Sequence, residues 1–244
     1  MSDTRTPKPS AANDSTGDAS TQSDSAESDS AAGAPPAVAG AAAEALAREL
    51  AGNFRGHVRR ALGIDLDGSI TSLAFVDHYL RSSRDETRAP IVTLVAAEAG
   101  AYFGELVREH VGASWVGDAV DPRRLRLLMS PQFLYCSPID QALEALLGPV
   151  AADDERLPED SPLDTAFHAR SKGGVEVDDQ DDESWLAERL AELPPVSEQE
   201  YYTLTCRFET LQVVLELLAA RHSGAGESPR EYTLRDYVDA LTSG

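Results

Sequence analysis

The chain has 244 residues, of which 42% are hydrophobic, and a formal net charge of −21 at neutral pH. This length and hydrophobic content are enough for one substantial core. The negative charge repels the phosphates of nucleic acids and the headgroups of anionic lipids, so we expect neither a nucleic-acid nor a membrane partner. The same charge favours basic proteins as partners.

Two cysteines, Cys136 and Cys206, stand far apart in apolar surroundings, where a reduced thiol is the ordinary state. The first residues lack the basic region and apolar stretch of a secretory signal. The longest apolar segment, 90–104, contains Glu98 and is too short to span a bilayer. These features predict a soluble, cytoplasmic protein.

Residues 1–38 are rich in Ser, Asp, Ala, Thr and Pro and contain no aromatic residue. Such a segment buries too little apolar surface to offset the entropy of ordering, so we predict a disordered tail before a single domain at 39–244. The domain is expected to begin with a helix over 41–62, where large apolar residues recur every four positions. A turn at 65–68 then precedes a second helix that starts at Ser69.

A third helix is predicted from Ala89 to Gly112. It is apolar on nearly all sides, which is typical of a helix buried in the middle of a fold. Gly100 and Gly104 leave a flat strip on it where another part of the chain can approach closely. After this helix, short apolar or alternating segments separated by Asp-Pro and Ser-Pro turns predict two or three antiparallel strands between 113 and 136.

The next helix is expected to have Ser137 as its N-cap and Pro138 at its first position, and to end at Gly148. Residues 151–182 are dense in Asp and Glu, so we predict a long solvated loop, although the same charge would suit a metal ion or a basic peptide. A short helix over 182–193 follows the loop.

The C-terminal helices, within 183–242, are expected to pack on the core. Ser197 and Glu200 form a capping box that predicts the start of a long helix, and Ser228 and Glu231 form a second one before the last helix. The long helix carries apolar residues in alternating steps of three and four, a seam typical of a helix that packs lengthwise on another. The residues of this 201–218 seam are Tyr201, Leu204, Phe208, Leu211, Leu215 and Leu218.

The predicted elements make an α+β fold that is predominantly α, in which helices over 39–150 carry a short antiparallel β-hairpin or three-stranded sheet. Few motifs of catalytic chemistry occur. The five histidines are scattered without ligand spacing, and no Walker loop, nucleophile elbow or dinucleotide fingerprint is present. The sequence therefore predicts no catalytic, cofactor-binding or metal-binding residue.

One motif at 63–70 resembles the first motif of haloacid-dehalogenase-type phosphohydrolases. The resemblance implies that Asp65 attacks phosphorus, that Asp67 handles the leaving-group proton, and that Mg²⁺ neutralises the phosphate. The family places this motif after a buried strand, whereas a helix is predicted here, so the alternative is a turn with a helix N-cap. The lysine and the magnesium ligands of such a site would be Lys172 and the aspartate pair at 178–179 or 181–182.

A second pattern, Y-x-G-E…G-x-x-W, runs from Tyr102 to Trp115. It resembles small uncharacterised bacterial domains of unknown function, in which a helix bearing Gly-Glu precedes a short hairpin that begins with Trp. The resemblance spans about residues 65–147. It implies an α+β fold and carries no activity with it.

Four residues around this pattern, Glu98, Tyr102, Glu105 and Trp115, form a candidate polar cluster. One interpretation is a polar pocket beside Trp115, which would suit a module that senses a small molecule. The other is structural: Glu105 pairs with an arginine, such as Arg108 or Arg124, and fixes the hairpin to the helix.

These observations favour a non-enzymatic protein-protein interaction or regulatory module whose partner is a protein, and a basic one if it binds the acidic surface. A homodimer through the 201–218 helix is a second option for the partner. The alternative function is a Mg²⁺-dependent, haloacid-dehalogenase-like phosphohydrolase that uses Asp65 and Asp67.

Overall fold

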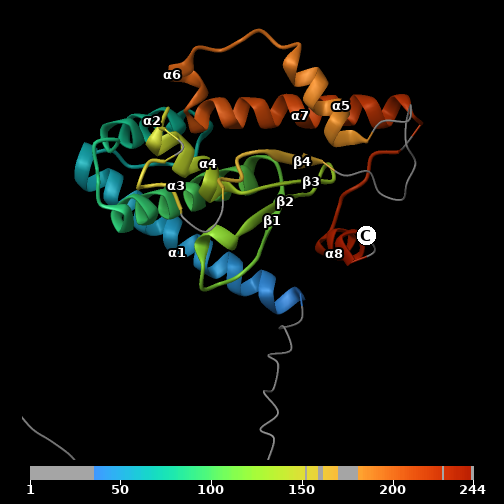
Figure 1. The fold of residues 1–244 in the computed structure, drawn as a ribbon. Helices are drawn as coiled ribbons and strands as arrows, with labels where there is room; N and C mark the ends of the chain where they lie inside the picture. Colours follow the sequence, from blue (N-terminus) through green and yellow to red (C-terminus); the bar gives the residue numbers. More distant parts are fainter. Residues whose placement is uncertain (1–35, 152, 159–161, 170–180, 227, 243–244) are drawn as a thin grey trace, which may run out of the picture. The chain divides into compact units, whose positions relative to one another are not determined.

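The structure is a computed structural model (Figure 1). Its first described element is helix α1 (Pro36–Leu62). It includes the last three residues of the predicted tail, 1–38. A proline at the first helical position is compatible with this start, because its missing N–H has no partner there in any helix. The remainder of the predicted tail lies outside the described residues. The structure describes residues 36–151, 153–158, 162–169, 181–226 and 228–242.

Helix α3 (Ala89–His110) is the central helix, as its apolar composition predicts. Every residue from Ala96 to Val107 is buried, and both α1 and α4 (Pro138–Leu147) pack against it (Figure 1). A Cβ atom at Gly100 would lie 2.5 Å from the Pro138 carbonyl oxygen, so the start of α4 directly contacts the α3 backbone. This contact confirms the close approach predicted at that glycine.

By length and composition, α3 is the one helix among the described residues that could cross a membrane. However, 72% of its apolar window is buried inside the fold. It therefore has the surroundings of a core helix.

The strands form one antiparallel sheet in the order β1-β2-β3-β4. The first three are the strands predicted between 113 and 136. The fourth corrects the prediction, because it lies inside 151–182, which the charge pattern predicts to be a loop. A strand of three residues is too short to show alternation in the sequence, and its pairing of His168 with Tyr135 is a contact between distant segments. The strands are β1 (Ala113–Val116), β2 (Arg126–Met129), β3 (Leu134–Cys136) and β4 (Phe167–Ala169).

The two faces of the sheet belong to different apolar clusters. Trp115 and Leu127 lie on the inner face and join the main core with α1, α3 and α4. Leu128 lies on the outer face and forms a smaller cluster with Phe133 and residues of the C-terminal segment. Because successive side chains of a strand point to opposite faces, one face of the sheet packs on the main core and the other on the C-terminal segment.

Tyr237 holds helix α8 (Leu234–Thr242) on the outer face. Its ring stacks on Phe133 with 4.1 Å between the centroids. Its hydroxyl lies 2.7 to 3.0 Å from the carbonyl oxygens of Met129 in β2, Gln132 in the turn and Leu134 in β3, and accepts a hydrogen bond from the Leu134 N–H. The turn and the C-terminal helix are therefore fixed to each other.

The predicted cap of this last helix is wrong. Thr233 and Asp236, rather than Ser228 and Glu231, cap α8: the Asp236 carboxylate accepts from the Thr233 N–H, and the Asp236 N–H donates to the Thr233 hydroxyl. Both pairs match the capping-box pattern. The Tyr232 N–H donates to a carbonyl of the β2–β3 turn, which keeps the residues before Thr233 out of the helix.

Two other helix starts differ from the prediction. The helix expected from Ser69 begins with a short 3₁₀ helix, η1 (Ile70–Ser72), which leads into α2 (Leu73–Ser82). Ser137 stands at the N-cap of α4 as predicted, but its side chain caps no helical N–H. Its hydroxyl instead accepts a hydrogen bond from Arg126.

The long C-terminal helix is interrupted. The capping box of Ser197 and Glu200 is confirmed, but the helix that it starts ends after one turn, and Thr203 caps a new helix. The buried Asp77 of α2 fixes this second start, because its carboxylate accepts from the Leu204 N–H at 2.7 Å. The helices of this part are α5 (Asp182–Ala191), α6 (Glu198–Tyr201) and α7 (Leu204–Gly224).

The predicted seam lies mostly inside the chain. Its leucines and phenylalanine on α7 are buried, except for the half-buried Leu215, and pack towards α2, α4 and α5. Tyr201 does not belong to the seam, because it ends α6 and is 41% exposed. A homodimer through this helix would therefore have to use its outer side.

Candidate functional site

Asp65 lies in a turn after helix α1, not after a strand. Its side chain is 69% exposed and pairs with Arg59. Asp67 accepts hydrogen bonds from the Ser69 hydroxyl and N–H, which lower the pKa of its carboxyl group. The motif therefore has the geometry of an exposed turn, with Gly68 at φ +80°.

Within the described part of the chain, no lysine and no predicted magnesium-binding aspartate of the phosphohydrolase site lies beside Asp65. Lys172 and the aspartates at 178–179 lie outside the described part of the chain. Asp181 accepts from the Ser184 N–H at the start of α5, and Asp182 pairs with Arg221 of α7. Within the described ranges, no group of three or more His, Cys, Asp or Glu side chains could hold a metal ion.

Glu105 and Trp115 of the predicted cluster do meet. The Trp115 indole N–H donates to Glu105 at 2.8 Å, and Arg108 donates two hydrogen bonds of 3.0 Å to the same carboxylate. The indole covers Gly104, where a Cβ atom would lie 2.2 Å from the ring. Trp115 is only 2% exposed. The contact fixes β1 to α3, which is the structural interpretation, and Arg124 pairs with Asp121 instead.

Glu98 and Tyr102 contact other parts of the chain. Glu98 is buried and lies 2.5 Å from a ring nitrogen of His57 in α1. The Tyr102 hydroxyl lies 2.7 Å from the Ser72 hydroxyl of η1. The four predicted residues thus connect α3 to three different elements.

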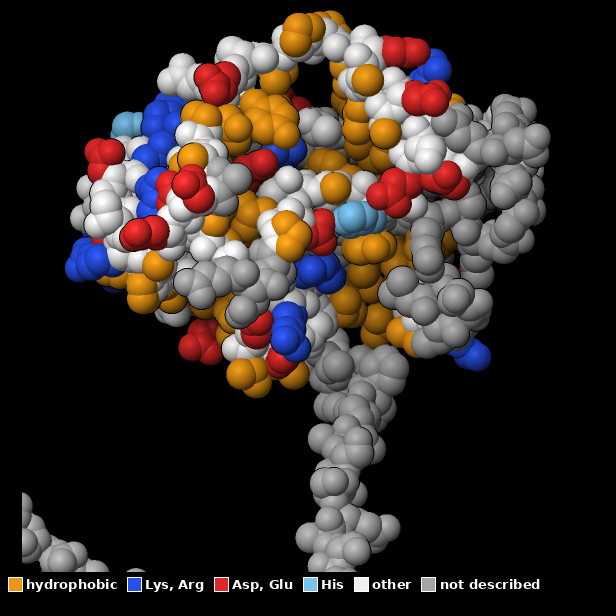
Figure 2. All heavy atoms as spheres, in the orientation of Figure 1, with side chains coloured by type: hydrophobic (Ala, Val, Ile, Leu, Met, Phe, Trp, Pro, Cys, Tyr) orange, Lys and Arg blue, Asp and Glu red, His pale blue; other side chains and the backbone are white. Residues whose placement is uncertain are grey.

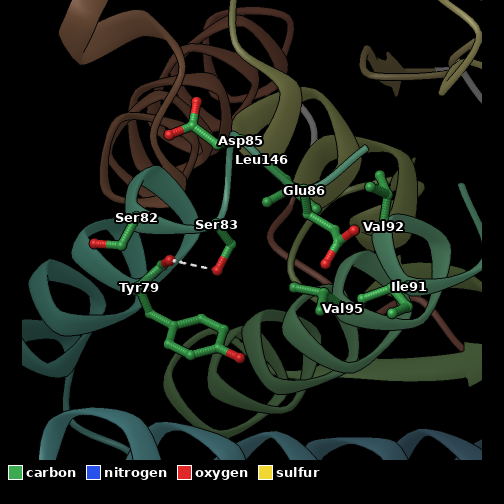
Figure 3. A pocket seen from close by; sticks show the side chains of 9 residues that line it. All are labelled: Tyr79, Ser82, Ser83, Asp85, Glu86, Ile91, Val92, Val95 and Leu146. Carbon is green, nitrogen blue, oxygen red and sulfur yellow. Dashed lines mark hydrogen bonds between the residues drawn. The ribbon is translucent and has the colours of Figure 1, made fainter. Parts of the chain in front are cut away.

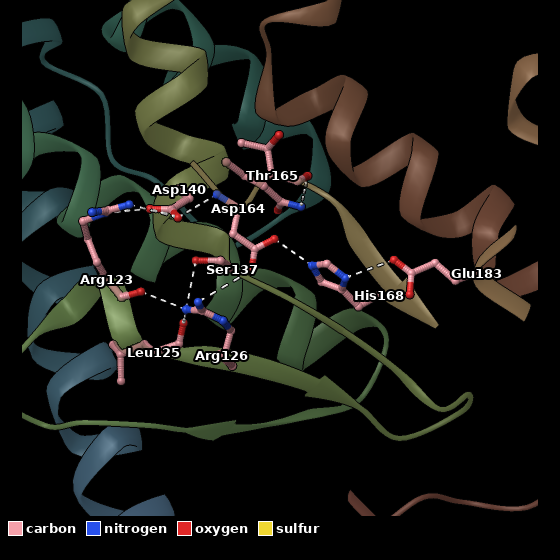
Figure 4. A network of polar contacts seen from close by, with 10 residues as sticks. Arg123, Leu125, Arg126, Ser137, Asp140, Asp164, Thr165, His168 and Glu183 are labelled. Carbon is pink, nitrogen blue, oxygen red and sulfur yellow. Dashed lines mark hydrogen bonds and ion pairs between the residues drawn. The ribbon is translucent and has the colours of Figure 1, made fainter. Parts of the chain in front are cut away.

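A larger polar network, which the sequence patterns did not predict, is centred on helix α4 (Figure 4). Its centre is Asp140, which is 2% exposed and accepts two hydrogen bonds from Arg123 and one from the Asp164 N–H. His168 of β4 lies between Asp164 and Glu183, with 2.7 Å and 3.4 Å to its two ring nitrogens. An aspartate in the apolar 138–147 helix could have indicated such a network, because a buried charge requires a partner.

This network joins elements rather than opening a site. It links η2 (Pro122–Arg124), β2, α4, β4 and α5, and each carboxylate in it has a partner. Paired buried charges are a common structural device. We therefore assign the network a structural role, that of holding these elements together.

The cysteines also give no sign of chemistry. Cys136 is fully buried, and this burial raises the pKa of its thiol to about 12. A thiol with so high a pKa is a poor nucleophile at neutral pH. The half-buried Cys206 lies on α7 and has no disulfide partner among the described residues.

The segment between α5 and α6 has the opposite character. All residues from 191 to 201, which we call the arch, are exposed. The arch rises above α7 (Figure 1), and Figure 2 shows hydrophobic atoms at its top and an opening beneath it. Leu193, Val196 and Tyr201 are 44%, 52% and 41% exposed. Large apolar side chains kept in solvent on one short segment are typical of an interaction site.

No family model, no curated protein and no solved structure matches this chain. The resemblance of the Tyr102–Trp115 pattern to uncharacterised bacterial domains therefore stays a prediction. The function has to be inferred from the surface itself.

Proposed function

We propose that this protein is a non-enzymatic, cytoplasmic interaction module whose arch docks onto a basic protein partner. The observation that carries the proposal is the unbroken exposure of 191–201 together with its three large apolar side chains. The arch connects α5 to α6, and both of these helices pack on α7, so the two ends of the arch are held in place.

The backbone of the arch favours binding in an extended form. Pro194 and Pro195 fix φ near about −65° and push the residue before each of them towards the extended region. Ser197, where the arch meets α6, has φ −65° and ψ 151°, which are polyproline II values. Because this conformation exists before binding, a partner loses little affinity in ordering the segment.

The charge of the arch selects the partner. Four exposed glutamates lie in or just before the arch, beside its apolar residues. An apolar stripe flanked by negative charge is complementary to a groove with apolar walls and a lysine- or arginine-rich rim, and the charges would also speed association. The flanking residues are Glu188, Glu192, Glu198 and Glu200.

The composition of the chain allows a direct test. Lys8 and Lys172 are its only lysines. In a K8R/K172R background, carbodiimide treatment in extract of the source cells will join the carboxylates of this chain to amines of the partner, with little crosslinking inside the chain. We expect crosslinked species that the double variant Leu193→Ser/Val196→Ser loses and the control Val120→Ser, at a site that is 88% exposed, keeps.

The crosslinked protein would then be purified and titrated against both variants by calorimetry. We expect affinity to fall when the salt concentration is raised, because the flanking charges are exposed. Equal binding by the arch variant and the control, or a partner without a basic surface, would contradict the proposal.

A further inference from the structure

A second feature with binding capacity is a cavity of about 360 Å³ near the start of α3. It lies between the end of α2, the connection 83–88 and the first turns of α3, with one residue from α4 (Figure 3). Cavities of this size accept small ligands or single side chains. The lining residues are Tyr79, Ser82, Ser83, Asp85, Glu86, Ile91, Val92, Val95 and Leu146.

The inner wall is apolar and held in place. Val92 and Leu146 are each 1% exposed and belong to the main core. The ring of Tyr79 packs edge-on against Phe54 of α1, with 5.5 Å between the centroids and 89° between the planes. The wall is therefore already formed before a ligand binds.

The two serine hydroxyls at the mouth can act only as acceptors towards a ligand. The Ser82 hydroxyl donates to the His78 carbonyl at 2.8 Å, and the Ser83 hydroxyl donates to the Tyr79 carbonyl at 3.0 Å, so only their lone pairs remain. Four backbone N–H groups of the lining are used within the chain as well. They belong to Ser83, Glu86, Ile91 and Val92.

Two carboxylates lie at the mouth, and that of Glu86 is paired with Arg88. Asp85 is exposed, and the Glu86 carboxylate is directed into the space between α2 and α3 (Figure 3). Glu86 accepts three hydrogen bonds from Arg88, which lower the pKa of its carboxyl group to about 2 and keep it ionised. Ionised carboxylates and hydroxyl lone pairs have no donor to offer an anion.

We infer that this cavity binds a primary ammonium group on an aliphatic chain, with the chain against Val92, Val95 and Leu146 and the ammonium at Asp85 and Glu86. An ammonium group supplies three donors and no acceptor, which matches the mouth, and four methylenes match the apolar wall. Such a group occurs in free aliphatic amines and in the lysine side chain of another protein. This inference is independent of the arch, which lies on a different segment.

The test uses methyl signals of the full chain. The chain has four isoleucines, of which only Ile91 lines the cavity, so the δ1 methyls of Ile64, Ile70 and Ile139 are internal controls. Hexylamine would be the free-amine probe, and N-acetyl-lysine amide the probe for a lysine side chain. Hexanol and hexanoate have chains of the same length with a neutral or a negative head.

We expect saturable shifts of Ile91 with hexylamine or with the lysine probe, and the stronger of the two identifies the source of the natural ligand. Hexanol should bind about tenfold more weakly than the better amine, since it lacks the charge-assisted hydrogen bonds, and hexanoate should not shift Ile91. Asp85→Asn/Glu86→Gln should reduce amine binding to the level of hexanol and leave hexanol unchanged. Glu198→Gln, on the arch, is the control variant.

The inference is overturned if neither amine shifts Ile91, if hexanol binds as well as the amines, or if the double variant keeps full amine affinity. Because Asp85 is exposed, Asp85→Asn alone should fold normally and gives a second measurement. If the two single variants, Asp85→Asn and Glu86→Gln, both kept the amine affinity of the wild type, the inference would be overturned as well.

Discussion

The contact between α3 and β1 and the arch contain the same kinds of side chain in opposite surroundings. In the first, Glu105 and Trp115 are 7% and 2% exposed and hydrogen-bond to each other. In the arch, Leu193 and Val196 are 44% and 52% exposed, with glutamates beside them. Acidic and apolar side chains that contact each other inside the protein stabilise the fold. Side chains of the same kinds that stay in solvent are available to bind another molecule.

The largest expected effect concerns a second buried acidic residue, in the Asp140 network, whose partner is an arginine. Asp140→Ala removes the carboxylate that pairs with Arg123, whose side chain is only 19% exposed. Removing one member of a buried ion pair costs about 3–5 kcal/mol. We expect the free energy of unfolding, measured with urea, to fall by this amount. A double variant with Arg123→Ala that is no more stable than the single variant would show that the lost pairing is not the cause.

The next largest effect concerns close packing on α3. Gly100→Ala places a Cβ atom 2.5 Å from a backbone carbonyl oxygen of α4, and overpacking of this kind costs about 1–3 kcal/mol. Gly52→Ala is the matched control in helix α1, where a Cβ atom meets nothing within 4 Å. It should stabilise the protein by about 0.5–1 kcal/mol, because alanine is the better helix former. Thermal unfolding of both variants should show opposite signs.

Asp77 adds a dependence on pH. Burial raises the pKa of its carboxyl group, although hydrogen bonds from Thr205 and Leu204 act in the other direction. A group whose pKa is higher in the folded than in the unfolded state stabilises the fold fully below the unfolded value, about 3.9, and this contribution is lost as the pH rises through the folded value. The stability of the wild type relative to Asp77→Asn should therefore decline from about pH 4 upward. A rise would mean that the α7 N-terminus stabilises the ionised form more than burial disfavours it.

A smaller effect is expected in the exposed half. Leu193→Ser/Val196→Ser should change the free energy of unfolding by less than about 0.5 kcal/mol, because the arch makes little contact with the core. Denaturation of this variant beside the wild type measures it. A larger loss would mean that the apolar side chains of the arch support the fold, and the comparison with Glu105 and Trp115 would fail.

Asp65→Asn should have the smallest effect, since its partner Arg59 is also exposed. We expect no change in stability beyond experimental error. Hydrolysis of p-nitrophenyl phosphate in the presence of Mg²⁺ should not differ between this variant and the wild type. A loss of turnover in the variant alone would return the phosphohydrolase hypothesis.

Local patterns predicted the elements whose causes are local. The all-round apolar composition of α3 and the capping box at Ser197 depend on neighbouring residues, and both are confirmed. The same holds for the α+β class, because three of the strands follow recognisable turns.

The errors arise where distant residues decide the structure. Strand β4 depends on its pairing with β3, and the new start of α7 depends on the carboxylate of Asp77. The partners of Asp140 come from segments before and after it in the chain. The exposure of the arch could likewise not be predicted from the sequence, because leucine and valine are residue types that are usually buried, whereas Leu193 and Val196 are exposed. No periodicity shows which apolar residue stays in solvent.

The position of Tyr237 has a consequence for synthesis on the ribosome. The N-terminal helices and the sheet are translated first, but the outer face of the sheet gains Tyr232 and Tyr237 only when residues near 237 have emerged. A chain that stops earlier would carry Leu128 and Phe133 without this cover, and such apolar surface is what chaperones and proteases bind. Helix α8 thus distinguishes a chain translated through residue 242 from one that stops before Tyr232.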